Sequence, residues 1–324
     1  MQYKYLKALV LGATLAITTS AAFAADPVTI HFGRQTAAED NLWLMIAKPE
    51  LSTNLNKAYK IEWNQFRASD VAFKAFEAGQ VDLFSTSINA AITAAAAGVD
   101  FKLIASLSRE SQNGANTKFP VKLDGPKTIA DLKGKIIGIV GQRSSVQLWA
   151  REAVRTGGLD PDKDVLWAVI PFPAVADAVR VGTITTGGIP DLFATGELAK
   201  GDLRVLFTSK TGIPFDEELI GVLATPDFIK KQPAAIRAFL ADLKATTQYF
   251  LAHLQESRQA LLDAKLVLLP PAVYLALPEY VRDPDLRPNL ENLTKQQDVL
   301  VSSGFVEKKI DLTKVVDTSF LPAP

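Results

Sequence analysis

The sequence contains the same succession of patterns twice. In each half a short apolar run, residues 28–33 or 135–141, ends at a glycine and leads through a polar loop into a helical pattern. A second strand-like run, a helix that ends at Gly79 or Gly182, and a third strand-like run then follow. Strands that alternate with helices pair in parallel through right-handed crossovers. The repeat therefore predicts an α/β protein with two similar lobes, each a mostly parallel sheet flanked by helices.

The 324 residues are enough for two compact domains. Beyond the second repeat the pattern changes to long helices without strands of their own, which we expect to pack back onto the first lobe. That lobe would then be discontinuous, residues 25–112 plus 222–324, and residues 113–221 would form the second lobe. The chain must cross between the lobes twice, near residues 109–118 and 212–223. Two crossings make a hinge, and two hinged lobes bound a cleft.

The N-terminus has the pattern of a secretory signal. Lys4 and Lys7 precede an apolar run, residues 8–17, and Ala22-Phe23-Ala24 fits the small-x-small cleavage site. The apolar run is shorter than the roughly 20 residues that a membrane-spanning helix needs. We therefore predict a signal peptide over residues 1–24, cleaved after Ala24, and an unanchored protein in the periplasm.

Composition excludes several classes of function. Basic and acidic residues both number 35, so no overall basic field exists to hold nucleic acid. Cysteine is absent, which excludes disulfides, thiolate metal sites and a thiol nucleophile. His31 and His253 lack the carboxylate spacing of a metal pair. No Gly-x-Ser-x-Gly elbow, phosphate loop or dinucleotide fingerprint occurs. We expect no metal, no cofactor, no catalytic residue and no nucleic-acid partner.

Ligands of open α/β sheets bind beyond the carboxyl ends of the strands, and in the second repeat this place holds Gln142, Arg143, Ser144 and Ser145. A serine at a helix N-cap, beside free backbone N–H groups, suits a carboxylate, sulfonate or nitrate. Arg143 would add a charge-assisted hydrogen bond if it pointed inward. The alternatives are ordinary capping by the serines and a solvated loop position for Arg143.

The first repeat offers matching polar positions. Gln35 follows the first strand, and its amide can both donate and accept hydrogen bonds. Ser85, Thr86 and Ser87 follow the strand-like residues 81–84 and would present three hydroxyl groups at a strand end. Helix capping is the alternative explanation for these hydroxyl groups.

Three aromatic residues lie toward the predicted cleft, namely Trp43, Trp149 and Phe172. They could stack on an aromatic or apolar part of a ligand. Burial in the core is the alternative.

Three stretches of the sequence match the motifs of a known family. They are residues 128–135 with Ser144-Ser145, which match a "D-L-K-G-K…G-S-S" stretch, residues 75–83, which match an "A-hydrophobic-x-x-G-x-x-D" turn, and residues 304–321, which match a closing segment. With these motifs the chain resembles the periplasmic substrate-binding proteins of ABC importers in the nitrate/sulfonate/taurine group. The similarity covers essentially the whole chain after residue 24. It implies a type II periplasmic-binding-protein fold, two lobes that close on one small anion, and delivery to an inner-membrane permease driven by a cytoplasmic ATPase.

Two departures from this family pattern concern the ligand. Residues 186–191, which include Gly188, replace a tryptophan-rich stretch, and these small residues leave room in the cleft. Arg143 stands where glycine is usual, which suggests a second anionic group or a different pose of the ligand. The resemblance therefore implies a small organic anion, a sulfonate or a carboxylate that can carry an aromatic ring.

We expect a monomeric binding protein rather than an enzyme. An enzyme on the same fold, similar to the pyrimidine-synthesising proteins of thiamine metabolism or to desulfinases, is the alternative. Desulfinase chemistry needs a cysteine, and a thiamine-type enzyme would be cytoplasmic and histidine-dependent, which the predicted signal and the position of His31 within a strand disfavour. A ligand-sensing partner of a membrane receptor is a third interpretation.

Overall fold

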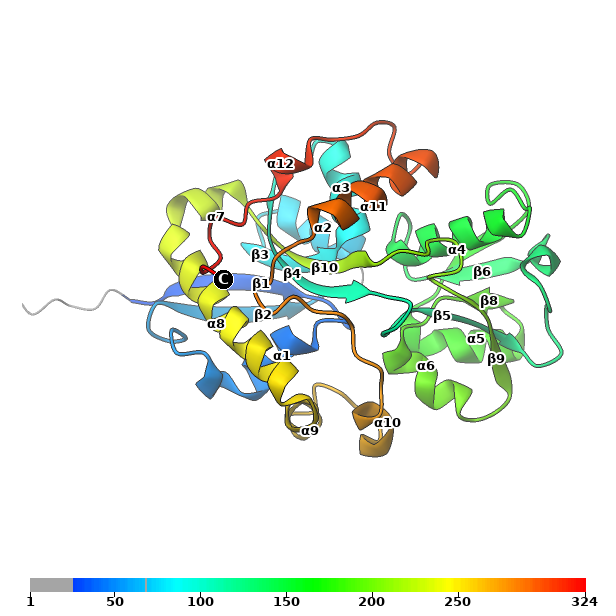
Figure 1. Cartoon of the computed structure of the whole chain (residues 1–324), viewed down its shortest axis with the longest axis horizontal. Coiled ribbons are helices and arrows are strands. Elements are labelled where there is room, and N and C mark those ends of the chain that lie inside the picture. Colours follow the sequence, from blue (N-terminus) through cyan, green and yellow to red (C-terminus); the bar gives the residue numbers. More distant parts are fainter. Residues whose placement is uncertain (1–25, 68) are drawn as a thin grey trace, which may run out of the picture.

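The computed structural model describes residues 26–67 and 69–324, which form two α/β lobes side by side (Figure 1). The predicted signal peptide, residues 1–24, lies outside the described residues. Among the described helices, none is both long and apolar enough to cross a membrane.

The first lobe is built on a five-stranded sheet in the order β2-β1-β3-β10-β4. Its strands are β1 (Val28–Arg34), β2 (Tyr59–Gln65), β3 (Leu83–Ser87), β4 (Lys102–Glu110) and β10 (Glu217–Ala224). Strand β1 pairs in parallel with β2 and β3, and β10 lies antiparallel between β3 and β4. The helices α1 (Asp40–Ala47), α2 (Ser69–Glu77) and α3 (Ile88–Ala96) follow the first three strands in turn. The predicted strand-helix alternation is confirmed.

The second lobe repeats this arrangement with shorter strands. A parallel sheet in the order β7-β6-β8 adjoins an antiparallel β5-β9 pair through the bridge between Lys118 and Ile189. Its strands are β5 (Lys118–Lys122), β6 (Ile136–Ile139), β7 (Leu166–Val169), β8 (Thr186–Gly187) and β9 (Leu203–Thr208). Its helices are α4 (Ser145–Thr156), α5 (Val175–Val181) and α6 (Asp191–Leu198). In each lobe the antiparallel strand next to the parallel set, β10 or β5, follows a crossing from the other lobe.

The C-terminal helices pack on the first lobe. They are α7 (Pro226–Lys231), α8 (Pro233–Ala252), α9 (Leu254–Asp263), α10 (Pro271–Leu275), α11 (Leu290–Ser302) and α12 (Leu312–Val315). Asn41 on α1 donates to Thr247 on α8 at 2.9 Å, and the hydroxyl of Tyr59 on β2 donates to Asp242 on α8 at 2.7 Å. Short 3-10 helices η1 (Pro49–Leu51), η2 (Ile129–Leu132) and η3 (Phe172–Ala174) complete the secondary structure.

Two segments connect the lobes, residues 111–117 between β4 and β5, and residues 209–216 between β9 and β10. Strand β10 pairs with β3 and β4 along its length, so it belongs entirely to the first sheet. The boundary that the sequence suggested between residues 221 and 222 falls inside this strand. The second crossing therefore precedes β10, at residues 209–216.

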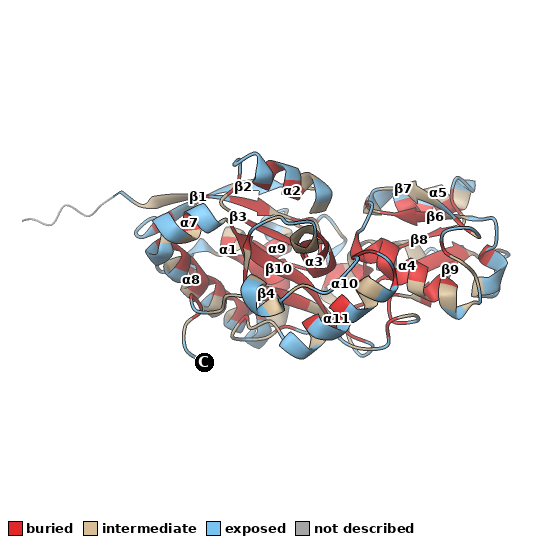
Figure 2. Cartoon of the chain, turned by 90° about the horizontal axis from the view of Figure 1, so that it is seen from above, coloured by how far each residue is buried: buried red, intermediate tan, exposed pale blue. Residues whose placement is uncertain are grey.

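Buried residues, red in Figure 2, are concentrated in the sheets of both lobes and in the helix faces beside them. One cluster of buried apolar residues extends from Phe32 and Phe239 in the first lobe to Phe119 and Trp149 in the second. Phe32 and Phe239 pack with ring centroids 5.5 Å apart, and Phe119 stacks on Phe207 at 4.3 Å. The two lobes are thus in direct apolar contact.

Candidate functional site

A cavity of about 80 Å³ lies between the lobes. It is lined from the first lobe mainly by the loop after β1, the end of β3, the end of β4 and the start of β10. The second lobe contributes the end of β6, the start of α4 and the loop after β7. The lining polar and aromatic residues are Gln35, Thr36, Arg67, Ser69, Ser87, Glu110, Thr117, Ser144, Ser145, Trp149, Phe172 and Tyr280. The cavity therefore occupies the place where parallel strands of both sheets end, as the general rule for such sheets predicts.

Two serines meet across the cavity. Ser87 at the end of β3 and Ser145 at the start of α4 place their Oγ atoms 2.6 Å apart. Asn89 on α3 also donates to Ser145 Oγ at 3.1 Å. Since Ser87 and Asn89 belong to the first lobe and Ser145 to the second, the lobes are closed on each other at this point.

Helices from opposite lobes begin at this contact. Ser87 caps α3 by accepting a hydrogen bond from the Ala90 N–H at 3.4 Å, and Ser144 caps α4 by accepting from the Gln147 N–H at 3.3 Å. The first turn of a helix leaves backbone N–H groups without partners inside the helix, and the macrodipole makes that end positive. Two such ends at one cavity favour a negatively charged group between them.

A buried carboxyl group lines the same cavity. Glu110, the last residue of β4, is fully buried, and its Oε1 accepts a hydrogen bond from the Thr117 hydroxyl at 2.7 Å. Its Oε2 has no hydrogen-bonding partner in residues 26–67 and 69–324. Burial raises the pKa of Glu110 to about 7, and Lys210, Ser209 and Thr117 offset only part of that rise.

A buried ion pair lies close to Glu110, at the second crossing. Lys210 Nζ is 2.7 Å from Glu217 Oε2, and both side chains are almost completely buried. The indole of Trp149 on α4 donates to the same oxygen at 2.7 Å. Trp149 belongs to the second lobe and Glu217 begins β10, so this bond also connects the two lobes.

Aromatic rings form the rest of the wall. Phe172, Trp149 and Tyr280 line the cavity, and Phe172 stacks on Phe193 with ring centroids 5.7 Å apart. Rings of this kind bury the apolar part of a ligand. The lining combines helix N-termini, one free carboxylate oxygen and aromatic surface.

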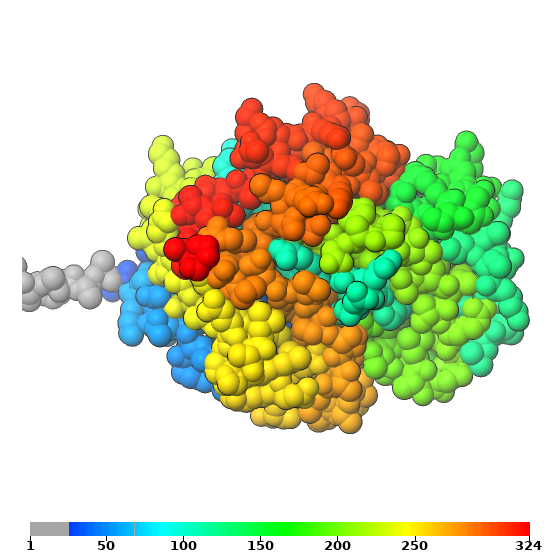
Figure 3. Space-filling view, in the orientation of Figure 1, coloured from blue at the N-terminus to red at the C-terminus, as the bar shows by residue number. Residues whose placement is uncertain are grey.

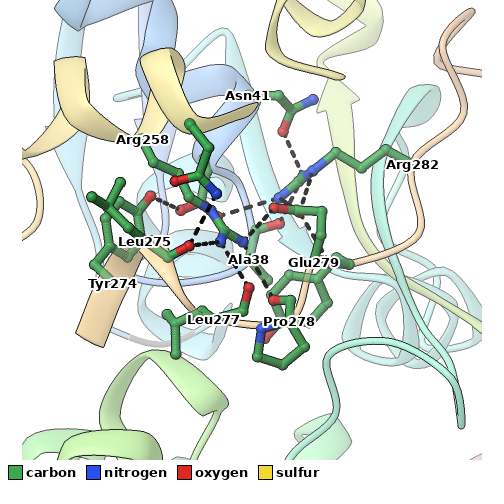
Figure 4. A network of polar contacts seen from close by, with 12 residues as sticks. Ala38, Asn41, Arg258, Tyr274, Leu275, Leu277, Pro278, Glu279 and Arg282 are labelled. Carbon is green, nitrogen blue, oxygen red and sulfur yellow. Dashed lines mark hydrogen bonds and ion pairs between the residues drawn. The ribbon is translucent and has the colours of Figure 1, made fainter. Parts of the chain in front are cut away.

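A polar network holds the segment that carries Tyr280 (Figure 4). Arg258 on α9 donates to the Leu277 carbonyl at 2.7 Å and to Glu279 at 2.9 Å. Arg282 also bonds Glu279 and donates to Asn41 on α1 at 2.7 Å. The two guanidinium groups thus fix residues 275–282 against α1 and α9.

Several residues predicted from the sequence line the cavity, namely Gln35, Ser87, Ser144, Ser145 and Phe172. Gln35 also donates to the Ser85 carbonyl at 2.9 Å, which orients its amide. Trp149, which the sequence offered as an aromatic candidate, lines the cavity as well.

Ser85 and Thr86 lie elsewhere, because β3 continues to Ser87 instead of ending at residue 84. The expected strand end was wrong by three residues. Both side chains are therefore fully buried within the sheet, outside the cavity lining. The Ser85 hydroxyl donates to the carboxylate of Glu39.

Gln142 and Arg143 are exposed and do not line the cavity. Gln142 accepts a hydrogen bond from Gln147 at 3.0 Å. Arg143 has a left-handed backbone with φ of 56°, and its Nη1 donates to the Phe305 carbonyl at 2.9 Å, just beyond α11. In Figure 3 the C-terminal part of the chain around the end of α11, coloured orange-red, lies beside the green second lobe. A cation near the C-terminal end of a helix is electrostatically favourable. Arg143 therefore binds within the protein, at the Phe305 carbonyl, and does not point into the cavity.

Trp43 and Gly188 have packing roles in this structure. Trp43 is buried, donates to Glu39 at 2.8 Å and borders an adjoining groove together with Phe172. A Cβ atom on Gly188 would lie 2.4 Å from Val146 Cγ1 on α4. The glycine therefore allows α4 to approach β8 instead of opening space in the cavity.

The cavity lining also includes three residues that were not predicted from the sequence, Glu110, Thr117 and Tyr280. Glu110 and Thr117 lie at the two ends of the first crossing, so a polar residue beside a predicted hinge was the available signal. Tyr280 lies in an irregular segment, and no local pattern connects it with the strand ends.

Comparison with known proteins places the chain in a family. The sequence pattern of the NMT1-like family matches residues 21–267. The chain belongs to the NMT1-like family. Over 313 residues it is 28% identical to a protein of Escherichia coli (strain K12) named as an aliphatic sulfonates-binding protein, covering 94% of this chain and 93% of that one.

Solved structures share the fold of this NMT1-like chain. The alkanesulfonate-binding protein of Xanthomonas axonopodis pv. citri bound to MOPS superposes with a TM-score of 0.73 at 20% identity, over 91% of this chain and 99% of that one. The nitrate-binding periplasmic protein of Synechocystis PCC 6803 gives a TM-score of 0.74 at 12% identity, over 91% and 87%. The predicted periplasmic-binding-protein fold is confirmed.

The buried carboxyl groups of Glu39 and Glu110 should make the free energy of unfolding of this NMT1-like protein depend on pH. Burial raises the pKa of Glu39, like that of Glu110, to about 7. Between about pH 4.5, where an unfolded glutamate titrates, and pH 7 the folded state keeps both protons and the unfolded chain loses them. Each group should therefore lower the free energy of unfolding by up to about 3 kcal/mol as pH rises through this window. Urea denaturation at pH 5 and pH 8 measures the change.

The double variant E39Q/E110Q supplies the control for this pH dependence. Glutamine does not titrate, so the difference between pH 5 and pH 8 should shrink by several kcal/mol relative to the unmodified protein. An equal pH dependence in both proteins would contradict the assignment of the titration to these two groups.

Proposed function

We propose that this protein is an extracytoplasmic solute-binding protein that captures a small organic anion between its lobes and delivers it to the permease of an ABC importer. The observation that carries the proposal is the 2.6 Å contact between Ser87 and Ser145, which brings the N-termini of α3 and α4 to one cavity from opposite lobes. An anion at this place would interact with both lobes at once.

The relatives support this proposal. Sulfonate-binding and nitrate-binding proteins share the fold, and their ligands are anions. The predicted signal peptide would bring the chain to the periplasm, where such proteins act. The aromatic residues Phe172 and Trp149 favour a sulfonate or carboxylate that carries an apolar or aromatic part.

The proposed mechanism uses closure of the lobes. A ligand that contacts both helix N-termini binds the closed form more tightly than the open form, so it shifts the population toward closure. The inner-membrane permease, with its cytoplasmic ATPase, would recognise the closed form. The protein then acts by binding and release, without a catalytic step.

A thermal-shift screen tests the anion proposal. Aliphatic sulfonates, aromatic sulfonates, aromatic carboxylates and nitrate are each added to the purified protein. A ligand that binds only the folded state raises the melting temperature, by an amount that grows with its concentration above Kd. We expect at least one anion to do so and its uncharged amide or sulfonamide analogue to have no effect. Equal shifts by an anion and its uncharged analogue would contradict the proposal.

Replacing Ser145 with alanine tests the position of the site. This variant removes the hydroxyl that contacts Ser87 and Asn89, and we expect affinity for the best anion of the screen to fall at least tenfold, about 1.4 kcal/mol. Isothermal titration calorimetry gives the Kd. Ser257, a fully buried serine on α9 outside the cavity, provides the matched control S257A, which should keep the original affinity. Equal losses in the two variants would place the site elsewhere.

A further inference from the structure

We propose that Glu110 forms a subsite for a positively charged hydrogen-bond donor, so that the ligand carries an ammonium or amidinium group in addition to its anionic group. This inference rests on the proposed role of the inter-lobe cavity as the binding site. The helix N-termini account for an anionic group on the ligand, and the inference adds a cationic group to the same ligand.

The first support is the hydrogen bonding of Glu110. The Thr117 hydroxyl fixes Oε1 at 2.7 Å. The Ser209 hydroxyl is close enough to lower the pKa of Glu110 but forms no hydrogen bond with it, so Oε2 remains available to a ligand in the cavity that Glu110 lines. A buried carboxylate oxygen without a partner has lost its hydration without a compensating hydrogen bond, which is unfavourable. A donor on the ligand would recover that cost on binding.

The second support is the charge balance of the buried groups. Lys210 interacts with both acids, because its Nζ lies 2.7 Å from Glu217 and its charge lowers the pKa of Glu110. When all three groups are ionised, one buried negative charge remains, and it belongs to Glu110. An unpaired buried charge is unfavourable and is neutralised by a proton or by a cation. In the liganded protein, a cation of the ligand can take the place of the proton.

The other charged and titratable groups around Glu110 do not supply this cation. Tyr280 is adjacent, since the charge of Glu110 contributes to raising the Tyr280 pKa. Asp191 contributes in the same direction, and its carboxylate is already 3.3 Å from Lys118. Arg67 lines the cavity but is exposed. Burial raises the pKa of Glu110 to about 7, so a cationic ligand group can displace its proton near neutral pH at small cost.

A comparison with Glu39 shows that burial of a carboxyl group does not by itself leave an oxygen free at the cavity. Glu39 is also fully buried, and burial raises its pKa to about 7 as well. However, its Oε1 accepts from Trp43 and its Oε2 from Ser85, and Glu39 does not line the cavity. Both carboxyl groups are fully buried, but only Glu110 lines the cavity and has an oxygen without a hydrogen-bonding partner. That difference points to a ligand contact for Glu110.

The aromatic residues beside Glu110 favour the same kind of group. Tyr280 and Trp149 line the cavity, and aromatic rings attract ammonium and guanidinium cations. Glu110 and Thr117 lie at the first crossing, whereas Ser87 and Ser145 lie at the helix N-termini. The ligand class is therefore a zwitterion, with its cation toward the crossing and its anion toward α3 and α4.

Matched ligand pairs test this proposal by isothermal titration calorimetry on the purified protein at pH 7.5. Each pair exchanges an ammonium group for a methyl group of similar size: 4-(aminomethyl)benzoate against 4-ethylbenzoate, 4-(aminomethyl)benzenesulfonate against 4-ethylbenzenesulfonate, and 3-aminopropanesulfonate against butanesulfonate. We expect the ammonium member of at least one pair to bind at least tenfold more tightly. In the variant E110Q this preference should fall at least tenfold, because glutamine removes the charge and keeps the size.

The variant E39Q is the matched control, since it neutralises an equally buried carboxyl group outside the cavity. It should keep the preference for the ammonium member, and its melting temperature together with that of E110Q reports whether each variant is folded. For an E110Q that does not fold, E110D provides the second variant. Aspartate keeps the charge but withdraws it by one methylene, so the preference should be reduced but not abolished.

The outcomes are distinguishable. No preference for the ammonium member of any pair in the unmodified protein, or the same preference in E110Q, would overturn the inference. Tighter binding of the ethyl members that survives in E110Q would also overturn it, because the part of the cavity beside Glu110 would then prefer an apolar group to an ammonium group. Binding of 4-ethylbenzylamine that is lost in E110Q, without binding of any anion, would support the Glu110 subsite and refute the proposed anion site.

Discussion

Replacing Lys210 with methionine is expected to lower the free energy of unfolding by about 3–5 kcal/mol, because a buried ion pair that loses one partner leaves an uncompensated charge. Lys210 Nζ lies 2.7 Å from Glu217 Oε2 and also donates to the Phe215 carbonyl at 3.0 Å. Methionine fills a similar volume, so the loss would come mainly from Glu217. Urea denaturation at pH 7 measures it.

Two controls accompany the K210M variant. In K210M/E217Q the buried negative charge of Glu217 is also removed, so part of the loss should be recovered. Lys295 forms a pair with Glu291 on the exposed face of α11, and K295M should cost less than about 1 kcal/mol. A loss of the same small size in K210M and K295M would contradict the buried-pair interpretation.

The position of this pair connects stability with closure of the lobes. Glu217 begins β10 directly after the second crossing, and its Oε2 also accepts a hydrogen bond from Trp149 of the second lobe. The ion pair therefore orients an oxygen that holds the two lobes together. Loss of Lys210 should also weaken ligand binding, since Glu217 holds Trp149, which lines the cavity, across the two lobes.

Local patterns were sufficient to predict the two-lobed fold. Hydrophobic periodicity and a glycine turn predict each strand-glycine-helix unit. Both signals depend only on residues a few positions apart in the sequence. Ser144 and Ser87 were found for the same reason, because an N-cap serine is a local signal. The predicted contact of both lobes with one site follows from the topology of the repeats.

Residues whose role depends on distant partners could not be predicted in this way. The Arg143 guanidinium donates to the Phe305 carbonyl, which lies 162 positions later in the sequence, and no pattern around either residue predicts that contact. Ser85 was misplaced because a strand end has weak local signals and β10, which pairs with β3, comes much later in sequence. A ligand contact for Glu110 could be inferred only from the tertiary structure, which buries its carboxyl group and leaves one oxygen without a hydrogen-bonding partner.

Replacing Arg282 with methionine is expected to cost about 3–5 kcal/mol of stability, because its guanidinium is buried and several polar groups would lose their partner. Its Nη1 donates to Asn41 at 2.7 Å and to the Leu107 carbonyl of β4 at 2.8 Å, and its Nε donates to Glu279 at 3.0 Å. These bonds fasten the segment with Tyr280 to the first lobe, so ligand affinity should fall together with stability.

Two further variants serve as controls for R282M. Lysine keeps the charge but cannot reproduce the several fixed donors of a guanidinium, so R282K should lie between R282M and the unmodified protein in urea denaturation. Arg237 on α8 is exposed and donates to the Ser319 carbonyl at 2.5 Å, and R237M should cost less than about 1 kcal/mol. If R282K equalled the unmodified protein, charge alone would account for the stability. If R282M weakened stability but left ligand affinity unchanged at a temperature where it is folded, Tyr280 would not depend on this network for its position in the cavity.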